Sequence, residues 1–195
     1  MRISGGQLKG RKIASQKVFS KKGNESDLRP TSSKVREALF DILKYKIGGS
    51  SFLDLYAGTG TVGFEALSRG AERACFVEGN ARRSQSMKDV VLKIGLGERA
   101  FVYTRPALDF LRSAAKSGMR FDIIFADPPY ASDEIATILP LIDELPVLNE
   151  GGCLMIEHPS KSPLHALSAA SFVSLKFIKN YRYGDTMLTL LRKQP

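Results

Sequence analysis

The chain has 195 residues, 43% hydrophobic and 25% charged, which is ordinary for a soluble globular protein and sufficient for one domain with a real core. No run approaches the ~18 consecutive apolar residues of a membrane span, and the N-terminus lacks the apolar centre of a secretory signal. The cysteines, Cys75 and Cys153, each lie in an apolar strand-like run. This predicts buried thiols in a reducing cytoplasm, and neither a disulfide nor a metal site.

The positive charge is concentrated near the N-terminus. Residues 1–36 carry ten Lys or Arg and two acids, a net charge of +8, whereas residues 37–195 carry nineteen and eighteen, a net charge of +1. A basic segment can simply aid solubility, but its cations can also neutralise phosphates and release counterions. Because no amphipathic apolar face accompanies these charges, a nucleic acid is favoured over a membrane as the partner. The candidate RNA contacts are Arg2, Lys9, Arg11, Lys12, Arg29 and Arg36.

In chain order, the N-terminal part predicts a hairpin, a linker and a helix. Glycine-rich turns separate short strand-like stretches over residues 1–19, and residues 20–30 are polar. Hydroxyl side chains at 31–33 can cap a helix whose apolar positions then recur at helical spacing. We therefore expect a basic extension, residues 1–30, in front of a domain that spans residues 31–195.

From residue 51 onward, predicted strands alternate with predicted helices. The strands are expected at 51–56, 74–78, 100–104, 121–127, 152–158, 172–180 and 185–192. The helices are expected at 61–69, at 80–94, from Pro106, and at 133–145, where Pro140 predicts a kink or a break. This alternation predicts an α/β fold with a doubly wound, mostly parallel sheet and helices on both faces. The last two strands lack an intervening helix and predict a C-terminal antiparallel hairpin.

A glycine-rich loop follows the first strand of this region. In "DLYAGTGTVG", Gly58, Gly60 and Gly63 form a Gly-x-Gly-x-x-Gly motif, and Glu78 lies twenty residues past Gly58. This combination is typical of dinucleotide-binding folds, and a plain glycine turn is the structural alternative. Asp54 argues against a dinucleotide, because a buried acid ahead of the loop would repel a pyrophosphate and suit a cationic ligand. S-adenosylmethionine, with a sulfonium, an amino group, a ribose and no phosphate, fits these residues better.

We expect this cofactor to lie along the loop and beyond the ends of the neighbouring strands. The Glu78 carboxylate can accept hydrogen bonds from both ribose hydroxyls, and the glycines allow close approach to the backbone. The predicted cofactor-binding residues are Asp54, Tyr56, Ala57, Gly58, Thr59, Gly60, Glu78, Asn80 and Ala107.

The stretch "RFDIIFADPPYAS" ends a predicted buried strand in a carboxylate and two prolines. An exocyclic amino group of a purine is a poor nucleophile, so it must be held in line with a methyl sulfonium. The Asp127 carboxylate and the Pro128 carbonyl can accept its two N–H groups, and Pro129 helps to fix the backbone. Tyr130 offers a flat face on which an extruded base can stack. A rigid loop is the structural alternative, but these four residues are our candidate catalytic site.

Taken together, these stretches resemble the bacterial 16S rRNA guanine-N2 methyltransferases of the RsmD family. The resemblance covers the whole chain and is carried by "RISGGQLKGRKI", "RPTSSKVREALFDIL", "DLYAGTGTVGFEALSRGA", Glu78, "DPPY" and "YGDTML". It implies a Rossmann-like class I S-adenosylmethionine-dependent methyltransferase that modifies one guanine of 16S rRNA, in the small ribosomal subunit or a late assembly intermediate. It also implies a cytoplasmic monomer that needs neither metal nor membrane.

One departure from the family pattern follows the third predicted strand. The family usually has an acid near the adenine, whereas this chain has Arg105-Pro106-Ala107, with Asp109 as a weaker substitute. Two other functions stay open. "DPPY" is shared with DNA adenine-N6 methylases, although the chain is short for a separate target-recognition domain. A non-catalytic RNA-binding assembly factor is the second alternative.

Overall fold

The computed structural model describes residues 2–13, 32–129, 134–162 and 172–195. Within these ranges the helices are α1 (Ser33–Leu43), α2 (Thr61–Ser68), α3 (Ala81–Ile94), α4 (Ala107–Lys116) and α5 (Glu134–Glu144). The strands are β1 (Ser51–Leu55), β2 (Arg73–Glu78), β3 (Ala100–Thr104), β4 (Phe121–Ala126), β5 (Leu148–Pro159), β6 (Leu175–Tyr183) and β7 (Thr186–Lys193).

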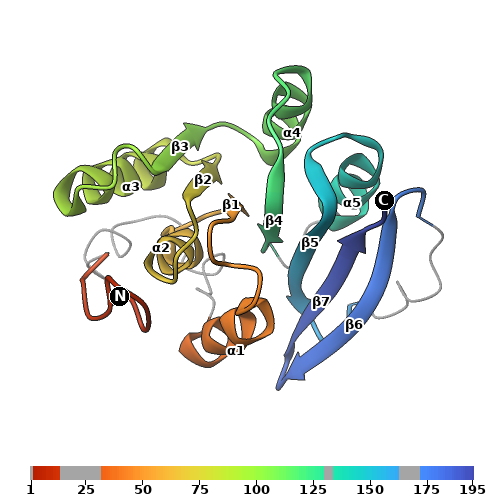
Figure 1. The fold of residues 1–195 in the computed structure, drawn as a ribbon, viewed down its shortest axis with the longest axis horizontal. Helices are drawn as coiled ribbons and strands as arrows, with labels where there is room; N and C mark the ends of the chain where they lie inside the picture. The colour runs from red at the N-terminus through yellow and green to blue at the C-terminus, as the bar shows by residue number, and fades with distance from the viewer. Residues whose placement is uncertain (1, 14–31, 130–133, 163–171) are drawn as a thin grey trace.

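The strands form one sheet in the order β3-β2-β1-β4-β5-β7-β6 (Figure 1). The first five strands are parallel, and β7 pairs antiparallel with both β5 and β6. The prediction of a doubly wound, mostly parallel sheet with a C-terminal antiparallel hairpin is therefore confirmed. The strand order reverses between β1 and β4, and in such sheets ligands bind beyond the carboxyl ends of the strands at this switch point.

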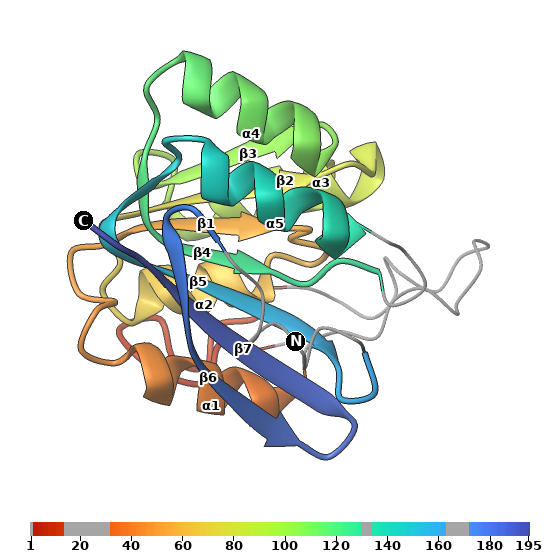
Figure 2. The ribbon, with the colours of Figure 1, turned by 90° about the vertical axis from the view of Figure 1, so that its right-hand side faces the viewer.

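Two hydrophobic cores lie on the two faces of the sheet. Figure 2 shows α4 and α5 above the sheet, with α1 and α2 below it. Alternate residues of β1 divide between the faces: Phe52 packs with α1, α2 and α3, whereas Leu53 and Leu55 pack with α4 and α5. Both cysteines are buried free thiols, as predicted. Within the described ranges, no helix has the length and hydrophobicity needed to cross a bilayer.

Local sequence signals account for both ends of α3. Asn80 caps α3 by accepting hydrogen bonds from two backbone N–H groups of its first turn, and Gly95 ends α3 in the left-handed conformation. Pro106 is the N-cap of α4, one position earlier than a first-turn proline. The break expected at Pro140 is absent: α5 continues through this exposed residue. Buried apolar residues on both sides of the proline pack onto the sheet and stabilise the helix.

The described N-terminal residues form a small hairpin that packs on α2 (Figure 1). An antiparallel bridge joins Arg2 to Lys12. Ile3 is 2% exposed and belongs to the core that contains α1 and α2. The hairpin also binds the end of α2, because the backbone N–H groups of Gln7 and Leu8 donate to the carbonyl and the hydroxyl of Ser68. This segment is thus held against the domain by both apolar and polar contacts.

Candidate functional site

The carboxyl ends of β1, β2 and β4 lie side by side at one edge of the sheet. Leu55 of β1 is level with the penultimate residue of β2 and with the last residue of β4. The residues that come next along these three segments are Tyr56, Glu78 and Asp127, and they therefore follow this row at the same edge of the sheet. Since adjacent strands are about 4.8 Å apart, the backbones of Glu78 and Asp127 lie roughly 10 Å apart, with the β1–α2 loop between them.

The β1–α2 loop has a tightly constrained backbone. Tyr56 is the one described non-glycine residue with a positive φ, at 62°, and Gly58 and Gly60 have φ values of 54° and 72°. The Ala57 N–H donates to the carbonyl of Val77 at 2.9 Å, which fastens the loop to β2. A non-glycine residue in this conformation costs free energy and is common at ligand sites. The loop therefore has a strained backbone that a simple connection from β1 to α2 would not need.

The glycines at 60 and 63 are required by packing. A Cβ at Gly63 would overlap the ring of Phe76 on β2, and a Cβ at Gly60 would collide with Met87 of α3. The glycine at 63 thus allows α2 to approach the sheet this closely, and the positive φ of Gly60 favours glycine there as well. The approach places the N-terminus of α2 beside the loop, where the helix dipole favours polar or anionic groups.

Glu78 binds the loop through both carboxylate oxygens. Its Oε2 accepts the Gly58 N–H at 2.9 Å, and its Oε1 accepts the Asn80 N–H at 2.7 Å. Arg83 Nη1 lies 3.8 Å from Oε1. Each carboxylate oxygen has two lone-pair directions, so these bonds leave capacity for further donors. The predicted ribose contact is compatible with this geometry and stays a prediction.

Asp54 is 2% exposed and lies below the loop. Its Oδ2 accepts the N–H of Gly63 at 2.9 Å, which ties β1 to the first turn of α2. Burial raises the pKa of Asp54 to about 7, the Gly63 hydrogen bond opposes this rise, and the charge of Glu78 adds to it. The structure thus holds an acid that lacks a strong cationic partner among the described residues, which is compatible with the predicted cationic ligand.

The remaining predicted cofactor residues surround this edge in different ways. The hydroxyls of Thr59 and Thr61 are 2.6 Å apart. The Tyr56 hydroxyl is buried without a hydrogen bond of standard geometry to the described residues. Burial raises the pKa of this phenol, and the Glu134 carboxylate raises it further. Ala107 is 7% exposed at the start of α4, beyond the end of β3.

The predicted catalytic residues follow β4 at the same edge. Asp127 is half-buried, Pro128 is buried and Pro129 is exposed. Tyr130 lies outside the described residues, so its stacking role stays a prediction. Asp109, the substitute for the missing acid near the adenine, has a side chain that is 63% exposed and pairs with Arg112.

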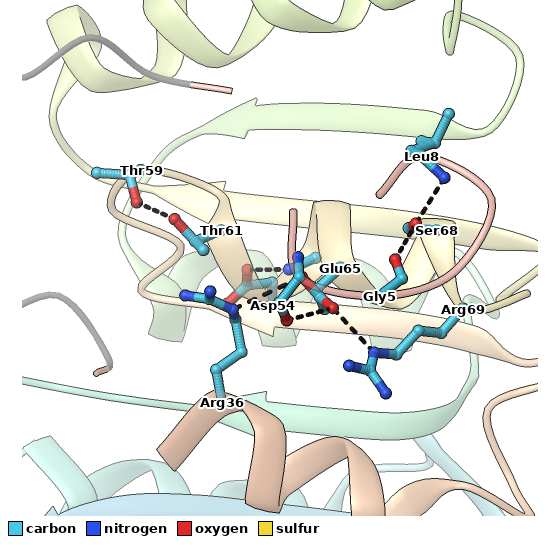
Figure 3. Close-up of polar contacts among 11 residues, drawn as sticks. Gly5, Leu8, Arg36, Asp54, Thr59, Thr61, Glu65, Ser68 and Arg69 are labelled. Carbon is cyan, nitrogen blue, oxygen red and sulfur yellow. Dashed lines mark hydrogen bonds and ion pairs between the residues drawn. The ribbon is translucent and has the colours of Figure 1, made fainter. Parts of the chain in front are cut away.

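The predicted RNA contacts divide into two groups. Four are exposed side chains of the hairpin: Arg2, Lys9, Arg11 and Lys12. Arg29 lies outside the described residues. Arg36 is 4% exposed, so its side chain does not face the solvent. Its side chain points inward because Glu65 of α2 lies 3.6 Å from its Nε (Figure 3).

Glu65 is a buried charged residue that the sequence patterns did not single out. It is fully buried, and its carboxylate accepts the N–H and the hydroxyl of Ser4, both at 2.8 Å, and the Nε of Arg69 at 2.9 Å (Figure 3). The available signal was a single acid in the otherwise apolar or small run "TVGFEALS". We call Glu65 with Ser4, Arg36 and Arg69 the hairpin junction.

The strand order, the glycine loop and the acids at the carboxyl edge define a Rossmann-like domain of the class I methyltransferase type. A family model described as "Conserved hypothetical protein 95" matches residues 1–192. The ribosomal RNA small subunit methyltransferase D of Haemophilus influenzae is 33% identical over 165 residues, 84% of this chain and 81% of that protein. The chain belongs to this family, the RsmD family of ribosomal RNA small subunit methyltransferases.

Solved structures agree with this assignment. The Escherichia coli protein yhhF superposes with a TM-score of 0.81 at 27% identity, covering 100% of this chain and 98% of that one. The Thermus thermophilus 16S rRNA N2 G1207 methyltransferase (RsmC), solved with AdoMet and guanosine, gives a TM-score of 0.67 at 20% identity. That match covers 88% of this chain and 45% of the other, and at this identity it shows a shared fold alone.

Proposed function

We propose that the chain transfers a methyl group from S-adenosylmethionine to the exocyclic N2 amino group of a guanine in 16S rRNA of the small ribosomal subunit. The observation that carries this proposal is the row formed by Glu78, Tyr56 and Asp127. In this proposal Glu78 accepts the ribose hydroxyls and Asp127 accepts the amino group, and what supports it is that they follow neighbouring strands on either side of one constrained glycine loop.

The residues present fit this cofactor. Glu78 retains hydrogen-bonding capacity for ribose hydroxyls, and the loop from Tyr56 to Gly60 offers a close backbone approach. Asp54 is an acid whose pKa is raised by burial and by the charge of Glu78, and a sulfonium and an ammonium would favour its ionised form. When bound, S-adenosylmethionine supplies an electrophilic methyl group on sulfur.

The role of the chain in the reaction is to hold the amino group of the base. The Asp127 carboxylate and the Pro128 carbonyl accept its two N–H groups, which directs the nitrogen lone pair at the methyl carbon. A nitrogen–carbon bond forms as the carbon–sulfur bond breaks, and one amino proton then leaves to Asp127 or to water. The buried Pro128 fixes the direction of this carbonyl, so little reorganisation is needed during the reaction.

The choice of RNA rests on the hairpin and on the relatives. The hairpin presents four exposed cations, which can neutralise phosphates. The name of the Haemophilus influenzae relative specifies ribosomal RNA of the small subunit, and that of the Thermus thermophilus neighbour specifies a guanine N2 atom. Residues 1–30 are in this proposal an RNA-binding extension of the methyltransferase domain.

The test is methyl transfer from labelled S-adenosylmethionine to small ribosomal subunits that lack the modification. We expect the label in N2-methylguanine of 16S rRNA, identified by nuclease digestion and mass spectrometry. Asp127→Ala should lower the rate by about 10²- to 10³-fold while RNA affinity is retained. The matched control Asp89→Ala removes an exposed carboxylate of α3 and should leave the rate unchanged.

Other outcomes of the same assay support the alternatives. Label in N6-methyladenine of DNA, with none in rRNA, would assign a DNA methylase. RNA binding without transfer to any base would assign an assembly factor, and Asp127→Ala would then leave its cellular role intact. Either result contradicts the proposed function.

A further inference from the structure

Arg36 is a buried cation whose Nε has no hydrogen-bond partner among the described residues. Its side chain is 5% exposed, and its Nε donates no hydrogen bond within the described ranges of the chain. Glu65 Oε2, at 3.6 Å, is beyond the usual length of an N–H···O bond, about 2.7–3.2 Å. Burying a guanidinium with an unsatisfied donor is unfavourable, so such a group needs an explanation.

Glu65 does not supply that explanation, because its Oε2 lies too far from the Arg36 Nε for a hydrogen bond and Arg69 already pairs closely with the carboxylate. The Ser4 N–H and hydroxyl and the Arg69 Nε all lie within 2.9 Å of its oxygens. Arg69 therefore neutralises the carboxylate at close range, and Arg36 is a second cation at a longer distance. The cluster has one positive charge more than Glu65 can balance. A second anion beside Arg36 would balance it.

The position of Arg36 indicates which anion this is. Glu65 lies one helical turn after Thr61, the first residue of α2, so the Arg36 guanidinium lies beside the N-terminal part of α2. Figure 3 shows the Arg36 side chain extending from α1 toward Glu65, on the side of α2 where Asp54 and Thr61 lie. The N-terminus of α2 is itself favourable to negative charge.

We propose that Arg36 binds the α-carboxylate of the methionine part of the methyl donor. The inference rests on the proposed function, which places the ribose at Glu78 and the transferred methyl near Asp127. The amino-acid chain branches from the sulfur between these points, over the β1–α2 loop. Its carboxylate then meets Arg36 and the start of α2, and its ammonium lies nearer to Asp54. Arg36 is a cofactor-binding residue in this arrangement and has no contact with the RNA.

The test compares S-adenosylmethionine with its decarboxylated analogue, which keeps the sulfonium and the amine and lacks only the carboxylate. Dissociation constants are measured by calorimetric titration without RNA. The unmodified protein should prefer S-adenosylmethionine, and Arg36→Met should weaken its binding by about 10- to 100-fold, as expected for the loss of a charged hydrogen bond. Binding of the analogue should change little, so the preference disappears.

Arg69→Met is the matched control, because it removes the other cation that pairs with Glu65. It should lower thermal stability and leave the preference for the carboxylate unchanged. The inference is overturned if Arg36→Met retains the preference, or if both variants lose it equally. Equal binding of both ligands by the unmodified protein also overturns it, even if Arg36→Met does not fold. An unmodified protein that binds neither ligand contradicts the proposed function instead.

Discussion

The β1–α2 loop and the hairpin junction are both organised by buried carboxylates, and both lie against the short helix α2. In the loop, Asp54 and Glu78 accept backbone N–H groups, and the one described cation paired with them is Arg83 at 3.8 Å. In the junction, Glu65 accepts a hydroxyl, a backbone N–H and a close guanidinium. The loop acids retain capacity for a ligand, whereas Glu65 already has three close donors from the chain.

This difference separates a binding role from a structural role for the same chemical group. An acid with several close donors fixes two segments in place, and removing it leaves those donors buried and unpaired. An acid held only by loop amides is positioned but not neutralised, so it favours a cation from outside the chain. The raised pKa of Asp54 is the electrostatic result of this second arrangement.

The largest stability effect should come from breaking the junction. Glu65→Ala leaves Arg36 and Arg69 without their buried partner and removes the anchor of Ser4, so we expect a loss of about 3–5 kcal/mol in the free energy of unfolding. Chemical denaturation measures it. Glu37→Ala, an exposed acid of α1, is the control and should change stability by less than about 0.5 kcal/mol. A Glu65→Ala loss as small as that of the control would contradict a structural role.

Asp54 should make stability depend on pH. Its pKa is raised from 3.8 to about 7, so between these values the folded state holds a proton that the unfolded state has lost. The free energy of unfolding therefore falls as the pH rises through this window, by up to roughly 4 kcal/mol. Asp54→Asn resembles the neutral form and should not show this fall.

The measurement is the stability difference between Asp54→Asn and the unmodified protein at a series of pH values across this window. We expect the variant to gain relative stability steadily as the pH rises. Asp109→Asn, whose side chain is 63% exposed, should show a nearly constant difference. A constant difference for Asp54→Asn as well would mean that Asp54 is ionised throughout and is paired more strongly than its contacts indicate.

Gly63→Ala should have a smaller effect on stability, and this effect should be confined to the β1–α2 loop and its surroundings. The new Cβ would overlap the Phe76 ring, so α2 must shift from the sheet at a cost of about 1–3 kcal/mol. The same shift would move the Gly63 N–H away from Asp54 and weaken binding of S-adenosylmethionine. Gly97→Ala is the control, because its Cβ would meet open space. Unchanged stability in Gly63→Ala would show that α2 can shift without strain.

The sequence predicted the arrangement around the β1–α2 loop far better than that of the hairpin junction. Alternating strands, the glycine spacing and the acid at the end of β2 are local patterns, and parallel pairing necessarily brings the carboxyl ends of β1, β2 and β4 together. The continuous α5 was not predicted, because flanking tertiary packing outweighs the local effect of Pro140.

The junction could not be predicted because it depends on contacts between distant parts of the chain. Ser4 and Glu65 are 61 residues apart, and no periodic pattern relates them. The burial of Arg36 follows from the same interaction, since its neighbours in sequence are equally compatible with an exposed helix face. Pattern reasoning identifies which face of an element is apolar, but it does not identify the partner of a buried charge.

The smallest expected effect concerns the exposed cations of the hairpin, which the junction holds in place. Each replacement of Lys9, Arg11 or Lys12 by Ala should weaken RNA binding modestly. It should also lower the dependence of log affinity on log salt by about 1 for each phosphate that the hairpin no longer neutralises. Their exposure implies that stability stays unchanged. Binding to a 16S rRNA fragment over a series of salt concentrations measures the slope.

Two further variants test whether the hairpin junction affects this salt dependence. Lys116→Ala removes an exposed cation of α4, which Figure 2 shows on the far side of the sheet from α1, and it should leave the slope unchanged. Ser4→Ala keeps every cation but removes a hydroxyl bond to Glu65. If the junction aligns the hairpin with the RNA, Ser4→Ala should lower the affinity for RNA at every salt concentration. It should also lower the slope of log affinity against log salt, because a misaligned hairpin neutralises fewer phosphates with the same charge. An unchanged affinity in Ser4→Ala would mean that the apolar packing of Ile3 alone positions the hairpin.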